Sequence, residues 1–399
     1  MKNRIASRMN AISPSLTLAI SAKAKAMKAA GESVVSFGVG EPDFNTPAHI
    51  VEAAKKALDD GQTKYTPSSG LLPLRKAICE KFKKDNGLIY EPSQIIVSNG
   101  AKHSIFNACY ALLEEGDEVI IPAPYWLTYP EVVKVCGATP VYIECSKEAK
   151  FKFTPEQLKA AITPKTKMLI FNSPSNPTGA VYNEEEVRAI AKVCEEAEIF
   201  VLSDEIYEKL CYNGVKPFSI AACSDKMKDL TITVNGVSKT YAMTGWRVGY
   251  LAAPKDVAKA IDSFQSHATS NASSISQYAT IEALASKDEE IEQMRKIFDC
   301  RREKLLKLID GIDGVEAVEP DGAFYVMLVV GGLYGKKYNG VAIENSIQFA
   351  DLLLEGEKVA TVPGISFGSP DCVRLSYALS DADIEEGLNR IARFVASLT

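Results

Sequence analysis

Between residues 48 and 290, short apolar runs alternate with longer amphipathic stretches, and this alternation limits the fold more than any other feature of the sequence. The apolar runs are residues 94–98, 118–122, 167–172, 199–203, 230–234 and 249–253. The amphipathic stretches include residues 102–114, 154–162 and 184–197. Strands that are apolar throughout and separated by helices are typical of a parallel sheet buried on both sides. The sequence therefore predicts an α/β fold with a mostly parallel central sheet covered by helices on both faces.

The chain outside this region has a different pattern. Residues 289–310 predict one long charged helix, and residues 13–31 predict a loop followed by a helix. After residue 310 come short apolar segments, a Gly-rich loop at 331–340 and a helix at 341–355, which indicate a smaller α+β unit. We therefore expect a large domain at 48–290 and a small domain formed from both chain ends, 1–47 and 291–399.

Composition excludes several classes of protein. Lys and Arg number 45 against 51 Asp and Glu, and the net charge of −6 disfavours a nucleic-acid-binding surface. Apolar runs are far shorter than the roughly 18 residues of a membrane span, and the polar N-terminal segment predicts no secretory signal. Nine cysteines without a Cys-x-x-Cys pair and only three histidines disfavour a metal site and indicate a reducing cytoplasm.

The residues that follow the predicted strands carry the chemistry, because ligands of open α/β sheets bind at the carboxyl ends of the strands. Asn99–Lys102 forms either an anion-binding helix start or an ordinary turn, and Asp204 serves either a ligand or a helix cap. The Pro- and Gly-containing turn at 173–179 presents Asn176. Lys239 follows a buried strand among small residues, where an amine can act as a nucleophile. Arg247, eight residues later, offers a guanidinium to a phosphate.

The segment G-V-S-K-T-Y-A-M-T-G-W-R-V-G at 236–249 resembles the pyridoxal-phosphate attachment signature of class I aminotransferases. Five further blocks fit the same family in the same order, at 39–44, 64–71, 172–179, 203–207 and 373–377. The closest likeness is to the bacterial type Ib branch of aspartate aminotransferases. The resemblance implies fold type I, pyridoxal 5'-phosphate as cofactor and a homodimer with shared active sites.

The resemblance also implies roles for residues around the cofactor ring. Lys239 should hold the cofactor as a Schiff base and then move a proton between the substrate α-carbon and the cofactor. Asp204 should pair with the pyridine nitrogen, and Tyr207 and Asn176 should bind the phenolate oxygen. Trp126 should lie over the ring and contact the substrate.

The phosphate is expected to be held by several groups, namely Arg247, Ser238 and the turn Gly100, Ala101 and Lys102. Tyr65 should reach the phosphate of the other subunit. The family often has a serine three residues before the lysine as a further phosphate ligand, and here that position is Gly236. We expect Ser238 to take over that contact.

Substrate recognition is inferred from the same resemblance. Arg374 should clamp the α-carboxylate, helped by Asn176 and the backbone at Gly40. In the type Ib branch a Ser/Thr pair and a lysine bind the distal carboxylate, and the matching residues here are Ser15, Thr17 and Lys102. The alternative for these three is a solvated loop and a helix-start lysine. Members that accept prephenate or arogenate tend to carry a basic residue just before the Ser/Thr pair, and Ser13 stands there instead, which argues against that activity.

The predicted function is reversible transfer of the amino group of L-aspartate to 2-oxoglutarate, by a ping-pong route through pyridoxamine phosphate. Alternatives on the same fold are an alanine, aromatic, kynurenine or prephenate aminotransferase, or a β-lyase. A pyridoxal-phosphate-sensing transcription regulator would need a further basic helix-turn-helix segment, for which we expect no room before the large domain. A redox enzyme is disfavoured because Gly38-x-Gly40 continues into Glu41-Pro42 and not into a dinucleotide-binding turn.

Overall fold

The computed structural model describes residues 4–399, and its centre is a seven-stranded sheet of order β2-β8-β7-β6-β5-β3-β4. The strands of this sheet are β2 (Ile95–Ser98), β3 (Glu118–Ala123), β4 (Thr139–Glu144), β5 (Thr166–Asn172), β6 (Phe200–Asp204), β7 (Thr231–Gly236) and β8 (Gly249–Ala252). Strands β3 to β7 pair with one another in parallel, and β8 pairs antiparallel with both of its neighbours, β2 and β7. The predicted mostly parallel sheet is confirmed, and so are the six predicted strands.

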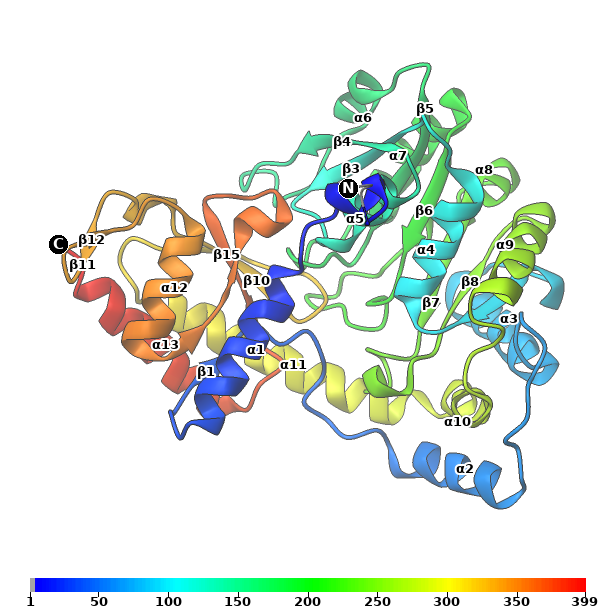
Figure 1. The fold of residues 1–399 in the computed structure, drawn as a ribbon, viewed down its shortest axis with the longest axis horizontal. Helices are drawn as coiled ribbons and strands as arrows, with labels where there is room; N and C mark the ends of the chain where they lie inside the picture. Colours follow the sequence, from blue (N-terminus) through cyan, green and yellow to red (C-terminus); the bar gives the residue numbers. More distant parts are fainter. Residues whose placement is uncertain (1–3) are drawn as a thin grey trace.

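Helices cover both faces of this sheet (Figure 1). On one face the apolar side chains pack against α4 (Ala101–Leu112), α5 (Thr128–Val135) and α9 (Lys255–Ala268). On the other face the helices are α2 (Ala48–Asp59), α3 (Leu72–Asn86), α6 (Pro155–Ala161), α7 (Glu184–Ala197), α8 (Asp225–Leu230) and α10 (Ser274–Ala285). Within β2, Ile95 and Val97 pack on one face and Ile96 on the other. Apolar residues at every position of a strand therefore reflect burial on both sides.

A second, antiparallel sheet of order β14-β15-β10-β9 lies beside the first. Its strands are β9 (Glu316–Val318), β10 (Tyr325–Val329), β14 (Val362–Pro363) and β15 (Cys372–Ser376). Two short pairs accompany it, formed by β1 (Val35–Ser36) with β13 (Val359–Ala360) and by β11 (Lys337–Tyr338) with β12 (Val341–Ala342). The surrounding helices are α1 (Leu16–Ala29), α11 (Asp288–Ile309), α12 (Ser346–Glu357) and α13 (Asp381–Ala396). The apolar faces of α11, α12 and α13 share one core with β10 and β15.

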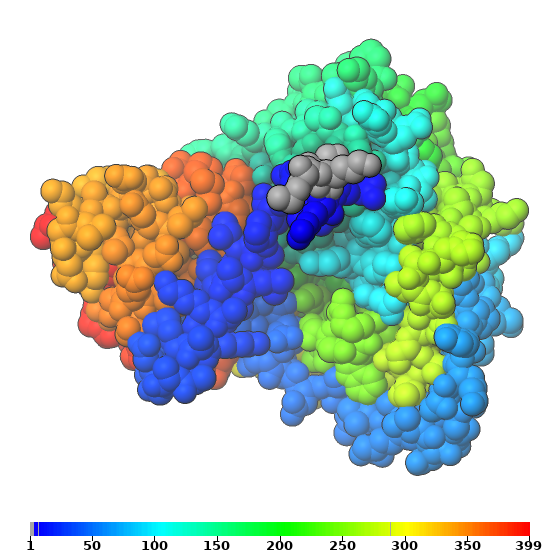
Figure 2. All heavy atoms as spheres, in the orientation of Figure 1, coloured from blue at the N-terminus to red at the C-terminus, as the bar shows by residue number. Residues whose placement is uncertain are grey.

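The two chain ends meet in this second unit. Strand β1 pairs in parallel with β13, with Val35 opposite Val359. The N-terminal residues then extend in the other direction, onto α5 of the large sheet, where the Ser13 backbone N–H donates to Glu131 at 2.9 Å. Figure 2 shows this blue segment lying across the boundary between the two units. The division into domains at 48–290 and at 1–47 with 291–399 stays a prediction.

Two details differ from the predicted elements. The helix expected at 341–355 begins at Ser346, because the Asn345 side chain accepts hydrogen bonds from the backbone of Ile347 and Gln348 and caps the helix there. The Gly-rich segment 331–340 is not entirely loop, since it contains a short 3-10 helix at Gly331–Leu333 and strand β11. Within residues 4–399, no helix combines the length and the apolar character needed to cross a bilayer.

Candidate active site

A pocket opens at the carboxyl ends of the parallel strands, between the two sheets. Asn172 and Asp204 reach it from the last positions of β5 and β6, and Arg374 reaches it from β15 of the second sheet. The predicted site residues that line it are Ser15, Thr17, Gly40, Ala101, Lys102, Trp126, Asn176, Asp204, Tyr207, Ser238, Lys239, Arg247 and Arg374. The structure therefore brings together residues from across nearly the whole chain.

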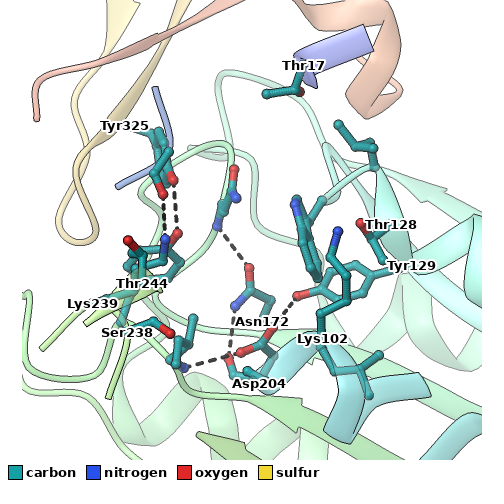
Figure 3. A pocket seen from close by; sticks show the side chains of 18 of the residues that line it. Thr17, Lys102, Thr128, Tyr129, Asn172, Asp204, Ser238, Lys239, Thr244 and Tyr325 are labelled. Carbon is teal, nitrogen blue, oxygen red and sulfur yellow. Dashed lines mark hydrogen bonds between the residues drawn. The ribbon is translucent and has the colours of Figure 1, made fainter. Parts of the chain in front are cut away.

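Lys239 presents a half-buried amine to this pocket, on the same side as Tyr325 (Figure 3). Its Nζ donates a hydrogen bond to the Gly40 carbonyl and lies 5.9 Å from the ring centroid of Tyr207. Burial lowers the pKa of Lys239 to about 8, and the charges of Arg374 and Arg247 act in the same direction. About half of this amine is therefore neutral, and nucleophilic, at pH 8.

Asp204 supplies a carboxylate at the bottom of the view in Figure 3, and it is 4% exposed. Its Oδ2 accepts a hydrogen bond from the Tyr129 hydroxyl at 2.8 Å, and its Oδ1 accepts one from the Ile206 backbone at 3.2 Å. The Asn172 side chain donates to the Asp204 backbone carbonyl at 2.8 Å. Burial raises the pKa of Asp204 to about 6, while the two hydrogen bonds oppose that rise. The carboxylate is thus rigidly held and charged near neutral pH.

The start of helix α4 and Arg247 together form a cradle for an anion. Gly100 is the N-cap residue with φ of +87°, and a Cβ there would lie 2.4 Å from Nη2 of Arg247. A Cβ on Gly249 would lie 2.2 Å from the Ala101 backbone nitrogen, so β8 and the helix start also approach closely. The Thr244 carbonyl accepts from Arg247 Nη1 at 2.8 Å and orients the guanidinium. Free backbone N–H groups and a guanidinium are what a phosphate needs.

Glycine at position 236, where the family often has serine, has a structural reason here. A Cβ on Gly236 would lie 3.1 Å from both the Gly249 Cα and the Ile206 side chain. Strands β7 and β8 therefore leave little space for a side chain at this point. Ser238, two residues later, lines the pocket.

Arg374 presents a guanidinium from the second sheet, and the residue is 2% exposed. Its Nη1 donates to Asn176 Oδ1 at 2.9 Å, and its Nη2 donates to the Gly38 carbonyl at 3.2 Å. The guanidinium carbon lies 4.4 Å from the ring centroid of Tyr325 and 5.1 Å from that of Phe367. Its Nε has no hydrogen-bond partner within the described residues. A buried cation with unused donors is suited to binding a carboxylate.

Of the three residues predicted to meet a distal carboxylate, all of which line the pocket, Thr17 lies at the top of Figure 3, across the pocket from Asp204, and Lys102 lies in the lower half of the view. Ser15 Oγ caps helix α1 by accepting from the Leu18 backbone at 3.4 Å. Thr17 Oγ1 is buried and lacks a hydrogen-bond partner anywhere in residues 4–399. Lys102 Nζ lies 4.7 Å from the Trp126 ring centroid, and burial followed by the charge of Arg247 lowers the pKa of Lys102. Thr17 and Lys102 are thus available to a ligand, while Ser15 also has a capping role.

Two predicted site residues do not line the pocket. Gly100 lies just behind it, at the N-cap of α4 against Arg247. Tyr65 is 92% exposed and lies outside the pocket of its own chain. Its predicted contact requires a second copy of the chain, so that role stays a prediction.

The sequence did not point to Tyr129 and Tyr325, which both line the pocket. Tyr129 contacts Asp204 as described, and the Tyr325 hydroxyl lies 3.0 Å from that of Tyr207. Tyr129 follows Trp126 by three residues at a helix start, a spacing that places two side chains on the same face and could have marked it. For Tyr325 the sequence offers only one hint of a site residue, a hydroxyl-bearing side chain at the start of an apolar strand.

This constellation agrees with known proteins. The model of the family described as aminotransferase class I and II matches residues 32–391. The chain belongs to this family. The aspartate aminotransferase of Bacillus subtilis (strain 168) is 50% identical, over 98% of this chain and 99% of its own length. An aspartate/prephenate aminotransferase of Cereibacter sphaeroides (strain ATCC 17029 / ATH 2.4.9) is 45% identical over 97% of this chain and 98% of its own length.

A solved structure is similar to this chain over its full length. The crystal structure of an aspartate aminotransferase from Rhizobium meliloti matches this chain with a TM-score of 0.96 and 43% identity, covering 100% of both chains. The fold of this aminotransferase-family chain is therefore that of the solved aspartate aminotransferases.

The donor set also fits the cofactor that the family implies, pyridoxal 5'-phosphate. The pocket offers an amine of lowered pKa for the aldehyde, a buried carboxylate for the ring nitrogen and an anion cradle for the phosphate, in Lys239, Asp204 and the α4 start with Arg247. Trp126 offers an aromatic face above them. These groups come from separate elements, and one ligand of this chemistry would satisfy all of them.

Proposed function

We propose that this protein is a pyridoxal-phosphate-dependent aspartate aminotransferase, which transfers the amino group of L-aspartate reversibly to 2-oxoglutarate. One observation supports this most strongly. The amine of Lys239 shares its pocket with two cationic side chains from different elements, Arg374 on β15 and Lys102 on α4. Both proposed substrates are dicarboxylates, and the two cations suit their two carboxylate groups. The names of the relatives support the same assignment.

Holding the cofactor is assigned to the residues around Lys239. Asp204 would pair with the ring nitrogen, Tyr207 and Asn176 with the phenolate oxygen, and Trp126 would lie on the ring. The phosphate would be held by Arg247, Ser238 and the turn Gly100, Ala101 and Lys102. When bound, pyridoxal phosphate supplies a conjugated, electron-withdrawing ring that stabilises negative charge on the substrate α-carbon.

The protein's own groups then carry out binding and proton transfer. Arg374 orients the substrate by its α-carboxylate, with Asn176 and the Gly40 backbone beside it. Thr17 and Lys102 meet the distal carboxylate, assisted by Ser15. The free amine of Lys239 would take the proton from the substrate α-carbon and pass it to the cofactor, because its lowered pKa of about 8 leaves part of the amine as a neutral base near neutral pH.

We also propose that two copies of the chain share their active sites and that the protein works in the cytoplasm. The exposed position of Tyr65 leaves this side chain free to reach a second subunit. All nine cysteines are free thiols, which supports a reducing compartment.

An amino-donor profile tests the proposal. Purified protein with pyridoxal phosphate and 2-oxoglutarate is given aspartate, alanine or phenylalanine, and the initial rates are compared. We expect aspartate to have the highest kcat/KM. A higher value for alanine or phenylalanine would assign the protein to another aminotransferase specificity. A β-lyase would be recognised with an S-substituted cysteine as a further substrate, from which it would release a thiol, pyruvate and ammonia.

The same assay tests prephenate as an amino acceptor, since several relatives are named for aspartate and prephenate together. Ser13 stands where prephenate-accepting members carry a basic residue, and its backbone is bound to Glu131. We therefore expect prephenate to react much more slowly than 2-oxoglutarate.

A further inference from the structure

Tyr129 lines the pocket, and its hydroxyl contacts the carboxylate of Asp204. Its hydroxyl donates to Asp204 Oδ2 at 2.8 Å across 75 residues of sequence, as the dashed line in Figure 3 marks. The Tyr129 side chain is 2% exposed. The hydroxyl is therefore shielded from bulk water, and its hydrogen bond is directed into the site.

The local structure fixes the Tyr129 ring in this direction. Its backbone N–H donates to the Trp126 carbonyl at 2.9 Å, at the first turn of α5. The two rings pack edge to face, with centroids 5.3 Å apart and planes at 84°. On its other sides Tyr129 belongs to the apolar core that includes Val133, Ile170 and Leu202. One turn of chain thus positions both the aromatic face of Trp126 and the hydroxyl on Asp204.

The hydrogen bond from Tyr129 stabilises the charged form of a buried carboxylate. Asp204 is buried, and burial disfavours its charged form. Two donors oppose this effect, the Tyr129 hydroxyl on Oδ2 and the Ile206 backbone on Oδ1, and the charge of Lys239 adds to them. Of the two hydrogen bonds, the one from Tyr129 is the shorter. A hydrogen bond to a buried ion contributes more than one between neutral groups.

We propose that Tyr129 is a positioning residue for Asp204, whose hydroxyl keeps this carboxylate ionised and oriented so that it holds a protonated ring nitrogen. This inference rests on the proposed function, because the ring nitrogen belongs to the proposed cofactor. Tyr129 touches the carboxylate and acts through it. Its loss should therefore matter only for ligands that carry that nitrogen.

The test measures binding and needs no turnover. Full-length protein freed of cofactor is titrated with pyridoxamine 5'-phosphate, which binds without a covalent bond to Lys239, and with its analogue in which carbon replaces the ring nitrogen. The variants are Tyr129→Phe and, as a matched control, Tyr182→Phe. Tyr182 is also buried and its hydroxyl accepts from the Phe153 backbone at 2.8 Å, outside this pocket. Tyr129→Met is a second variant without the donor in case the Phe variant does not fold.

We expect Tyr129→Phe to weaken binding of pyridoxamine phosphate by about 10- to 100-fold, the loss typical of a hydrogen bond to a buried charged group. We expect less than twofold change for the carbon analogue, and less than twofold change for either ligand with Tyr182→Phe. Tyr129→His, which retains an N–H donor, should keep part of the preference for the nitrogen-containing ligand.

Three results would overturn the inference. They are an equal loss for both ligands, no loss for either ligand, and a wild-type protein that binds both ligands equally well. If the wild-type protein bound neither ligand, the proposed function itself would fail. The two failures are therefore distinguishable.

Discussion

Replacing Arg374 by lysine keeps the positive charge but removes the planar, forked donor. In the structure the guanidinium is anchored to Asn176 and Gly38 and lies over the Tyr325 ring. A lysine ammonium cannot bind a carboxylate through two parallel N–H groups and keep these anchors. Each hydrogen bond from a charged group contributes about 1.5–3 kcal/mol. Losing one bond to the substrate and the anchor on Asn176 corresponds to about 3–6 kcal/mol, or a fall in kcat/KM of about 10²- to 10⁴-fold.

The assay couples oxaloacetate formation from aspartate and 2-oxoglutarate to a reduced nicotinamide, and kcat/KM is determined for both substrates. Because both bind through an α-carboxylate, both values should fall together. Arg302→Lys is the matched control, since Arg302 is 2% exposed and pairs with Asp299 and Glu319 outside the pocket. It should lower the melting temperature and leave kcat/KM within about twofold. An Arg374→Lys enzyme that kept kcat/KM within threefold of wild type would refute the assigned role.

Further predictions concern the pH dependence, the phosphate cradle and the substrate side chain. The neutral form of Lys239 predominates above its pKa of about 8. The rate at which cofactor-free protein captures pyridoxal phosphate should therefore rise about tenfold per pH unit below pH 8 and level off above it. A rate that continued to rise up to pH 10 would contradict this prediction. Gly100→Ala should weaken cofactor binding at least tenfold, because the added Cβ displaces Arg247. The control Gly214→Ala is also at positive φ but has open space around its Cβ among the described residues, so it should lower only the melting temperature. Similar cofactor affinities for the two variants would argue against the cradle. Lys102→Met, which leaves the backbone of the phosphate-binding turn in place, should raise KM for aspartate about tenfold or more and change KM for alanine little, because only aspartate has a distal carboxylate. The oxaloacetate formed from aspartate and the pyruvate formed from alanine are each coupled to a matching dehydrogenase, and equal changes for both donors would remove the specificity role.

The strands of the large sheet could be predicted because burial on both faces leaves a continuous apolar signature. Strand β4 at Thr139–Glu144 lacks this continuous apolar signature and was not predicted. It lies at the edge of the sheet, and its residues are mostly exposed or only partly buried. The antiparallel direction of β8 also could not be deduced from its composition. It follows from the connection at residues 237–248, which holds turns and a short 3-10 helix and no crossover helix.

The residues of the site divide in the same way. Lys239, Asp204 and Arg374 stand in local motifs, so a resemblance to a family is enough to mark them. Tyr129 and Tyr325 are defined by contacts with partners 75 and 118 residues away. Such contacts depend on how the sheets and helices pack, and no local pattern contains them. For Ser15 a local pattern has two explanations, because the residue predicted to bind substrate also caps helix α1, and the cap alone would explain a serine there.

The central claim is that Lys239 is the amine that carries the cofactor in this pocket, and one measurement tests it directly. Purified protein is incubated with pyridoxal phosphate, reduced with borohydride, digested and mapped by mass spectrometry. We expect one stable pyridoxyl-phosphate adduct, located on Lys239, and loss of both the adduct and the cofactor absorbance in Lys239→Ala. An adduct on a different lysine, or an unchanged absorbance in Lys239→Ala, would contradict the claim.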